Sequence, residues 1–152
     1  MSFGKGLSAY AARTKLSIDD AVIAINSKAA DLIISRTPRD TGRAKGNWIP
    51  TISTPSSDIT DNTDEAMAKS QSNLVASQSA GKVFYIANNL PYIRVLEYGE
   101  YPTPVKLGTW DKEHQIYEVR SINGYSYQAP NGMVRLTLQE IKSFIVKEWR
   151  AV

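Results

Sequence analysis

The segment RTPRDTGRAKGNW, which spans Arg36–Trp48, separates a helical pattern from a strand pattern in the first third of the chain. Before it, apolar residues recur at steps of three and four, which predicts an amphipathic helix over 17–36. Pro38 ends this helix, because a residue that precedes a proline disfavours helical angles. After the segment, the apolar residues around Pro50 predict a strand, which the proline restricts to a sheet edge.

We interpret this segment as a structural corner between the helix and the strand. Asp40 is expected to accept hydrogen bonds from nearby backbone amides, and Gly42 to adopt a positive φ, as these residue types often do in turns. Trp48 then anchors the start of the strand. The residues assigned to the corner are Thr37, Pro38, Asp40, Thr41, Gly42 and Trp48.

The triplet Asp40-Thr41-Gly42 also matches the active-site triplet of retroviral-type aspartic proteases. Their chemistry needs an aspartate at the end of a buried apolar strand, paired with a second aspartate that shares its proton. Here the triplet follows a helix end and a proline, and basic residues lie on both sides of it. We therefore favour the turn, and keep as an alternative a protease that is active only as a dimer.

Downstream of the corner, the sequence predicts both helices and strands. The expected elements are a polar loop over 53–64, a helix over 64–79, a strand over 81–89, a short helix over 90–99, a turn-rich excursion over 100–130 and a helix over 131–149. Gly99 is a C-cap candidate for the short helix, and Asn123-Gly124 is a pair favoured in tight hairpin turns. The apolar stripe of the last helix comprises Val134, Leu138, Ile141, Ile145 and Trp149.

Together these elements predict a single α+β domain over residues 1–152. Its N-terminal and C-terminal amphipathic helices would pack on a small, mostly antiparallel sheet, and a loop or hairpin over 100–130 would protrude. Residues 1–16 are expected to be a basic N-terminal arm, with an extended conformation as one alternative.

The composition excludes several classes of protein. The chain has 152 residues, of which 42% are hydrophobic and 22% charged, and it contains no cysteine. A disulfide framework, a thiolate zinc site and a cysteine nucleophile are thereby excluded. The N-terminus has no apolar run of signal-peptide length, and no stretch is long enough to span a membrane. We therefore expect a soluble chain, made in the cytosol, with no membrane partner.

The sequence indicates no enzyme, and we predict no catalytic, cofactor-binding or metal-binding residue. The glycines of the corner lack the phosphate-loop spacing, and no serine lies in a nucleophile-elbow motif. His114 is the only histidine, so any metal site would depend mainly on oxygen ligands. A solvated turn explains the DKEH stretch that contains it better than a metal site does.

Charge is distributed unevenly although the net charge is only +3. Residues 1–16 and the corner are basic, whereas residues 51–80 are acidic. Basic residues in the first two segments are candidates for facing DNA, since neutralising phosphates needs little more than such charge. These candidates are Lys5, Arg13, Lys15, Arg43 and Lys45. A small DNA-binding protein without sequence specificity is therefore an alternative from another functional class.

A second cluster, LPYIRVLEYGEYP over Leu90–Pro102, contains three tyrosines and both signs of charge. Tyrosine and arginine are enriched at protein interfaces, because they combine rigid contact area with a polar tip. We assign Ile93 and Leu96 to the core of the domain. The candidates for a subunit or partner interface are Tyr92, Arg94, Glu97, Tyr98 and Tyr101.

Two spaced motifs give the chain a resemblance to a known family. Thr37, Pro38, Asp40, Thr41, Gly42, Arg43 and Trp48 match the pattern T-P-x-D-T-G-R-x-x-x-x-W, and Leu96, Glu97, Tyr98 and Gly99 form L-E-Y-G after an asparagine-rich strand end. In this order they resemble motifs of small neck and tail-component proteins of long-tailed bacteriophages, known as tail completion, minor tail or head–tail joining proteins. The resemblance extends from about Thr14 to Trp149 and includes QAPNGMVRLTL before the last helix.

The resemblance implies a non-enzymatic α+β subunit that forms a ring, commonly sixfold, between the DNA-filled head and the tail. Its partners would be further copies of itself, a head-side connector or stopper protein, a tail terminator or tail tube protein, and phage DNA that passes through the lumen without sequence specificity. The protein would belong to the virion and assemble in the host cytoplasm. A head stopper or tail terminator ring is the alternative within the same class. The excursion over 100–130 is longer than the link typical of this motif pair.

Overall fold

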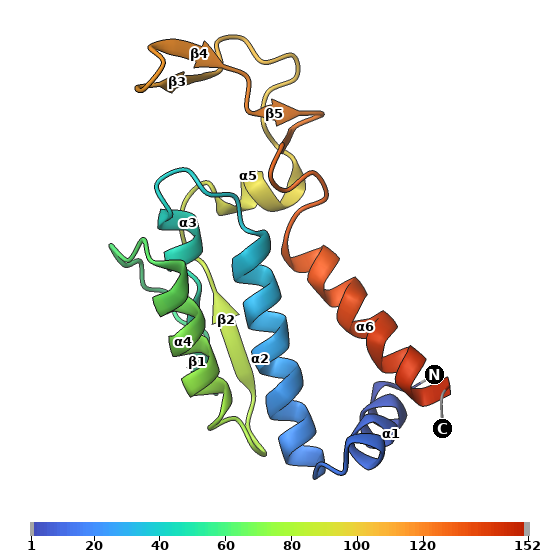
Figure 1. The fold of residues 1–152 in the computed structure, drawn as a ribbon. Helices are drawn as coiled ribbons and strands as arrows, with labels where there is room; N and C mark the ends of the chain where they lie inside the picture. Colours follow the sequence, from blue (N-terminus) through green and yellow to red (C-terminus); the bar gives the residue numbers. More distant parts are fainter. Residues whose placement is uncertain (1, 151–152) are drawn as a thin grey trace.

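The computed structural model describes residues 2–150, which form six helices and three two-stranded antiparallel sheets (Figure 1). The helices are α1 (Phe3–Thr14), α2 (Ile18–Arg36), α3 (Arg43–Gly46), α4 (Glu65–Ala76), α5 (Ile93–Tyr98) and α6 (Val134–Arg150). The strands are β1 (Ile49–Ile52), β2 (Phe84–Ala87), β3 (Thr109–Asp111), β4 (Ile116–Glu118), β5 (Ser121–Ile122) and β6 (Tyr125–Ser126). This content confirms the predicted α+β class.

The central helix of the domain is α2, which lies between α4 and α6 (Figure 1). It begins after Ser17, whose hydroxyl accepts a 3.1 Å hydrogen bond from the Asp20 amide and donates one to the Asp20 carboxylate. This cap satisfies an amide that the helix itself leaves unpaired. The helix ends at Arg36, directly before the Thr37-Pro38 step, as predicted. No helix within residues 2–150 has both the length and the apolarity needed to cross a membrane.

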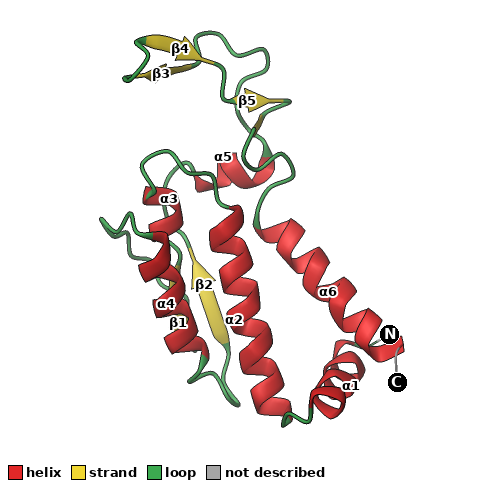
Figure 2. Ribbon diagram, viewed as in Figure 1, coloured by secondary structure: helices red, strands yellow, loops and turns green. Residues whose placement is uncertain are grey.

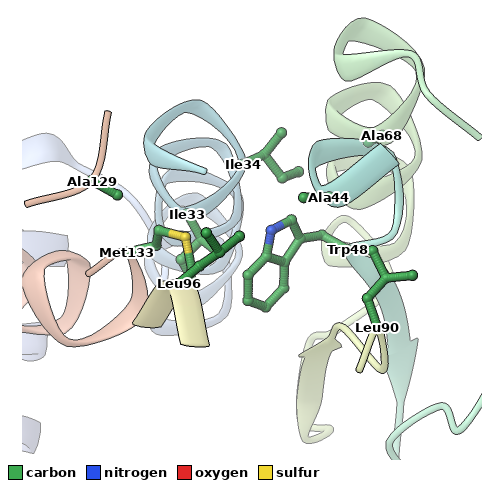
Figure 3. Packing of buried hydrophobic residues seen from close by; sticks show 9 residues of the cluster. All are labelled: Ile33, Ile34, Ala44, Trp48, Ala68, Leu90, Leu96, Ala129 and Met133. Carbon is green, nitrogen blue, oxygen red and sulfur yellow. The ribbon is translucent and has the colours of Figure 1, made fainter. Parts of the chain in front are cut away.

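Two apolar clusters make up the core, and α2 contributes to both. Its C-terminal half packs with the corner and α5 around the indole of Trp48 (Figure 3). The buried members of this first cluster are Ile33, Ile34, Ala44, Trp48, Ala68, Leu90, Leu96, Ala129 and Met133. The N-terminal half of α2 packs with α1 and α6, and the buried members there are Leu7, Ala11, Ala21, Ile25, Ile141 and Ile145.

Of the two predicted terminal helices, α2 reaches the sheet through the first cluster, against which Ile86 of β2 packs, whereas α6 packs on α2 and α1. Residues 3–14 form helix α1 and not an extended arm, because Leu7 and Ala11 are buried in the cluster that α6 completes. Gly6 permits the close approach of the two helices, since an added Cβ would collide with the side chain of Ile145.

The apolar stripe of α6 differs from the prediction at one position. Leu138 is 58% exposed, and Thr137 is buried in its place. The Thr137 hydroxyl accepts a 2.9 Å hydrogen bond from Arg36 and donates one of 2.8 Å to the Met133 carbonyl, so this burial leaves no hydroxyl unpaired. Trp149, the last predicted member of the stripe, lies outside the residues whose side chains the structure describes.

The predicted sheet forms from β1 and β2, with Ile49 opposite Ala87 and Ile52 opposite Phe84. Because this sheet has two strands, Pro50 lies in an edge strand, as expected. α4 packs along both β1 and α2 and so holds the sheet to the helices.

Residues 100–130 form an arm that projects beyond α5, away from the long helices (Figure 2). The arm contains two hairpins, β3–β4 and β5–β6. Asn123 and Gly124 form the turn of the second hairpin with φ of 51° and 85°, as the Asn-Gly pair predicts. The arm therefore protrudes as the sequence indicates. The Asn-Gly pair predicted its second hairpin, whereas no sequence signal had indicated the first, β3–β4.

Candidate assembly surfaces

Trp48 ties the end of α2 to the start of β1. Its side chain is 6% exposed, and its indole Nε1 donates a 2.8 Å hydrogen bond to Oγ1 of Thr37. The Thr37 hydroxyl in turn donates to the Ile33 carbonyl at 2.7 Å. Helix end and strand start are thus joined by one buried hydrogen-bond chain, and the predicted anchoring role of Trp48 is confirmed.

The turn of the corner depends on Gly42, but not on Asp40 in the predicted way. Gly42 has a φ of 92°, as predicted, and an added Cβ would collide with the Thr63 carbonyl oxygen. The side chain of Asp40 is 77% exposed and accepts a 3.2 Å hydrogen bond from Arg120 of the arm, instead of bonding nearby amides. The local turn bond comes from Thr41, whose hydroxyl accepts from the amide of Arg43 at 3.3 Å.

Asparagine side chains at the corner hold an exposed acidic loop over 56–61. Asn47 accepts a 2.8 Å hydrogen bond from the Thr60 amide and donates one of 3.0 Å to the Thr60 carbonyl. Asn89, at the end of β2, donates to the carbonyls of Ser56 and Asp58 at 2.9 and 3.0 Å. The backbone of this loop is therefore fixed at both ends by side-chain amides.

Lys45 does not face DNA, which corrects its assignment. The residue is 7% exposed, and its ammonium group donates to the Ser35 carbonyl at 3.0 Å and pairs with Glu65 at 2.9 Å. Hydrogen bonds from Lys69 and then Lys45 lower the pKa of Glu65, in keeping with this pairing. Lys45 is thus a structural cation that connects α2, α3 and α4.

The remaining candidates for DNA contact do not form one surface. Lys5, Arg13 and Lys15 are exposed on α1 or at its C-cap, whereas Arg43 is exposed at the start of α3. Figure 1 shows α1 and α3 at opposite ends of α2. The fold therefore keeps the two basic segments apart.

Glu97 is a buried cap of α6 and not an exposed interface residue, which corrects its assignment. Its carboxylate accepts hydrogen bonds from the amides of Met133, Val134 and Arg135 at 2.7, 2.8 and 3.0 Å. Burial alone would raise the pKa of Glu97, but these bonds and one from the Arg135 side chain outweigh it, so the pKa lies below its ordinary value. The carboxylate also lies at the positive end of the helix dipole.

The contact region where α5, α6 and the arm meet, here called the joint, is completed by Arg135. The sequence analysis did not identify this residue. Its guanidinium donates to Glu97 Oε1 at 3.1 Å, to the Glu97 carbonyl at 2.6 Å and to the Tyr125 hydroxyl at 3.1 Å. It also lies over the ring of Tyr98, 4.8 Å from the centroid. A signal was available, because α6 has an arginine as its second residue and no acid in its first turn, where an anion is favoured.

The root of the arm is closed by tight backbone contacts. Gly99 ends α5 with a φ of 70°, and an added Cβ there would collide with the ring of Tyr125. Gly124, in the turn of the second hairpin, accepts a 3.0 Å hydrogen bond from the Tyr101 amide at the start of the arm. The L-E-Y-G motif therefore acts within the chain, where it caps α6 and fixes the arm to the body.

The other predicted interface residues lie at the surface beside this joint. Tyr92 and Tyr98 are 39% and 51% exposed, and the exposed Arg94 pairs with Glu100 at 3.0 Å. Tyr101 is half-buried, and burial is the main cause that raises its pKa. These four residues, unlike Glu97, have side chains at or near the surface.

The arm exposes large apolar side chains, which the sequence analysis did not single out. Trp110 and Tyr117 stack edge-to-face across β3 and β4, 5.0 Å apart between ring centroids, and are 46% and 55% exposed. The full exposed set of the arm is Leu107, Trp110, Ile116, Tyr117, Val119, Ile122 and Tyr127. Large apolar side chains that are exposed in such number on one segment are typical of interaction sites in soluble proteins.

A groove of about 810 Å³ lies between the arm and the corner. Residues 38–44 line one side, and residues 101–109 and 118–128 contribute to the other. Arg120 spans it by pairing with Asp40 on the opposite wall. The groove therefore brings the first motif and the arm to one place, which their separation in sequence does not suggest.

Asp111, His114 and Glu118 bring one potential metal-ligand atom each within 4.8 Å of one another on the arm. Asp111 also accepts the Glu113 amide at 2.8 Å, which makes a local turn. Its hydrogen bond to His114 is the main cause that raises the pKa of that imidazole. Arg120 lies 3.4 Å from Glu118 and 3.9 Å from Asp111, so a side-chain cation already supplies the positive charge.

No family model, curated protein or solved structure matches this chain.

Proposed function

We propose that this chain is a structural subunit of the neck of a long-tailed bacteriophage, a tail completion protein that forms a ring, joins the tail to the DNA-filled head and lets the genome pass. The observation that carries this proposal is the apolar surface of the arm. Seven large apolar side chains of residues 107–127 are 46–67% exposed on a segment that projects from the body. A partner that covers these side chains would remove apolar surface from water, which stabilises the complex.

The two motifs behind the family resemblance support the proposal through their roles in the fold. The first motif builds the corner through Thr37, Gly42 and Trp48, and the second fixes the arm through Glu97 and Gly99. Both motifs thus shape how the chain presents its surface. A rigid platform with a projecting apolar arm suits a subunit that must engage neighbours in a fixed geometry.

The proposal assigns the same partners that the resemblance implies. Copies of the chain form the ring, with six as the expected number, and a head-side connector or stopper protein contacts one face. A tail terminator or tail tube protein contacts the other face, and DNA passes through the lumen without sequence-specific recognition. The protein has no enzymatic role and resides in the virion after assembly in the host cytoplasm. A head stopper or tail terminator ring is the alternative of the same class.

The test is to delete the gene from its phage and to image the lysate by electron microscopy. We expect filled heads and finished tails that remain separate, or joined particles that fail to deliver DNA. Normal, infectious particles would overturn the assembly role. Complementation adds a structural control: the natural chain should restore joining, whereas a chain with Leu107, Trp110 and Tyr117 all changed to serine should remain folded and fail to do so.

A further inference from the structure

Among the residues that the structure describes, three cations line the groove without a carboxylate partner. The two carboxylates of the groove wall, Asp40 and Glu118, both pair with Arg120, at 3.2 and 3.4 Å. The groove cations that form no ion pair within residues 2–150 are Arg39, Arg43 and Lys106. All three residues are exposed, so the groove presents an excess of positive charge to a ligand.

Between these cations the wall of the groove is apolar. Leu96 is buried, and Tyr101 and Val105 are half-buried, where they line the groove. A matching ligand would place an aliphatic side chain on this wall and carboxylates beside the cations. This chemistry describes an acidic polypeptide segment with one aliphatic residue between its acids.

The chain itself contains such a segment, the acidic loop over 56–61. Asp58, Ile59 and Asp61 are exposed there, and Ile59 is 48% exposed although it is a large aliphatic residue. Within residues 2–150, neither aspartate forms an ion pair. The loop thus carries the complementary pattern, an aliphatic side chain flanked by two unpaired carboxylates.

The loop is preorganised for display. The amides of Asn47 and Asn89 hold its backbone at Ser56, Asp58 and Thr60, over distances of 2.8–3.0 Å. A fixed backbone lowers the entropy that a segment loses on binding, and this raises affinity. Four side-chain hydrogen bonds, two of them partly buried, therefore fix the backbone of a loop whose own side chains are exposed, as a contact surface requires.

The acidic loop and the groove lie on different sides of the corner. Gly42 and Gly46 pack against the backbone of Thr63 and Asn62 on the loop side, whereas residues 38–44 also line the groove. In Figure 1 the loop lies at the outer edge of α4, and the arm lies beyond α5. A contact between groove and loop of two copies therefore uses different surfaces on each copy. Such a heterologous contact repeats from copy to copy and produces a ring when the rotation closes.

We infer that the groove of one copy binds the acidic loop of a neighbouring copy of this chain. Ile59 of the neighbour lies on the apolar wall, and its Asp58 and Asp61 pair with the groove cations. The inference rests on the proposed ring and names the contact that builds it. A nucleic-acid backbone is the competing occupant, since phosphates would also attract Arg39 and Arg43.

Disulfide cross-linking in assembled particles tests the contact directly, because the chain has no natural cysteine. Phage particles are prepared with Ile59→Cys and Val105→Cys in one chain, oxidised, and analysed by non-reducing electrophoresis and immunoblotting. The double variant should give a ladder of covalent oligomers that ends at the ring size. Each single variant should give none. The control, Ile59→Cys with Leu138→Cys, places the second thiol on α6 at a residue that is more exposed than Val105, and should also give none.

Charge exchange gives a second, independent readout in the same particles. Asp58→Lys with Asp61→Lys, or Arg39→Glu with Arg43→Glu, should each lower infectious titre at least about tenfold, as expected for lost charge-assisted contacts. All four substitutions together should restore it to within about threefold of the natural chain. Lys142→Glu with Lys147→Glu makes the same change in net charge as the arginine pair, at exposed positions of α6, and should leave the titre near normal.

The outcomes separate the inference from the proposed function. Particles that contain the chain but yield no ladder, and no rescue on charge exchange, overturn the inference and leave the ring to another surface. Particles that lack the chain overturn the proposed function and the inference with it. A third outcome has two parts: the purified chain binds duplex DNA and loses this binding in the variant Arg39→Glu with Arg43→Glu, and the particles give no ladder. That outcome assigns the groove to nucleic acid and overturns the protein contact.

Discussion

The helical body and the arm differ in how they use apolar side chains. In the body, two buried clusters on either half of α2 hold the long helices together. In the arm, large apolar side chains from Leu107 to Tyr127 are 46–67% exposed. The root of the arm is nevertheless tightly built around Glu97 and Arg135. The arm is therefore firmly attached to the body although its large apolar side chains are exposed.

The largest expected effect lies in the body, at Trp48. Trp48→Ala should lower the free energy of unfolding by about 3–5 kcal/mol, because it leaves a cavity in the first cluster and removes the partner of Thr37. Urea denaturation followed by circular dichroism measures this. Trp48→Phe is the control, since it retains a buried ring and loses the hydrogen bond. A loss below about 1 kcal/mol for the alanine variant would contradict the role of the corner as a core element.

The next largest effect lies at the joint between body and arm. Glu97→Gln should cost about 2–3 kcal/mol at neutral pH, because it removes the charge that three backbone amides and Arg135 share. Glu100→Gln is the matched control at an exposed ion pair and should cost less than about 0.5 kcal/mol.

The difference in stability between the natural chain and Glu97→Gln should depend on pH in a definite direction. The pKa of Glu97 in the folded chain lies below the ordinary value of 4.5, so its stabilising effect is complete above that value. It is lost as the pH falls through the lower pKa of the folded state. The stability difference between the natural chain and Glu97→Gln should therefore shrink in acid. A difference that is constant down to about pH 3 would show that the charge of Glu97 is not what the cap requires.

A smaller effect is expected at the turn of the corner. Gly42→Ala should cost about 1–2 kcal/mol, because φ is 92° and the added Cβ meets the Thr63 carbonyl. Asp40→Ala should cost less than about 1 kcal/mol, since that carboxylate is mostly exposed and makes one surface ion pair. Thermal melting of both variants checks the order. Equal losses would mean that Asp40 contributes more to the turn than its contacts account for.

The smallest effect on stability is expected in the arm. Leu107→Ser should change the free energy of unfolding by no more than about 0.5 kcal/mol, because Leu107 is 67% exposed. Calorimetry of the purified chain measures this, with Leu96→Ser as the contrasting buried variant. A large loss for Leu107→Ser would mean that the arm is part of the core, and the contrast between arm and body would not hold.

Local sequence signals predicted much of the fold. The helix stop at Pro38, the positive φ of Gly42, the C-cap at Gly99 and the Asn123-Gly124 turn all depend on a few neighbouring residues, and the structure confirms each one. Apolar periodicity likewise gave α2, α4 and α6 in nearly correct positions. These features need no knowledge of distant partners.

The misjudged residues depend on partners that are far away in sequence. Lys45 looked like a surface cation, but α4 brings Glu65 to within 2.9 Å of it. Glu97 looked like an interface acid, but α6 brings amides 36 to 38 positions away. Helix α1 was missed because glycines weaken its pattern, although Gly6 is what lets α1 approach Ile145. Only the three-dimensional arrangement determines whether such residues are buried.

The hydrogen bond between the Tyr101 amide and the Gly124 carbonyl has a topological consequence. It brings the start of the arm and the turn of its second hairpin together beside α5, so the segment between these two points behaves as an insertion into a fold that closes without it. The free-energy cost of closing such an insertion rises only slowly with its length. The length of this segment can therefore change while the helices keep their positions, and the reach of the arm is separable from the stability of the body.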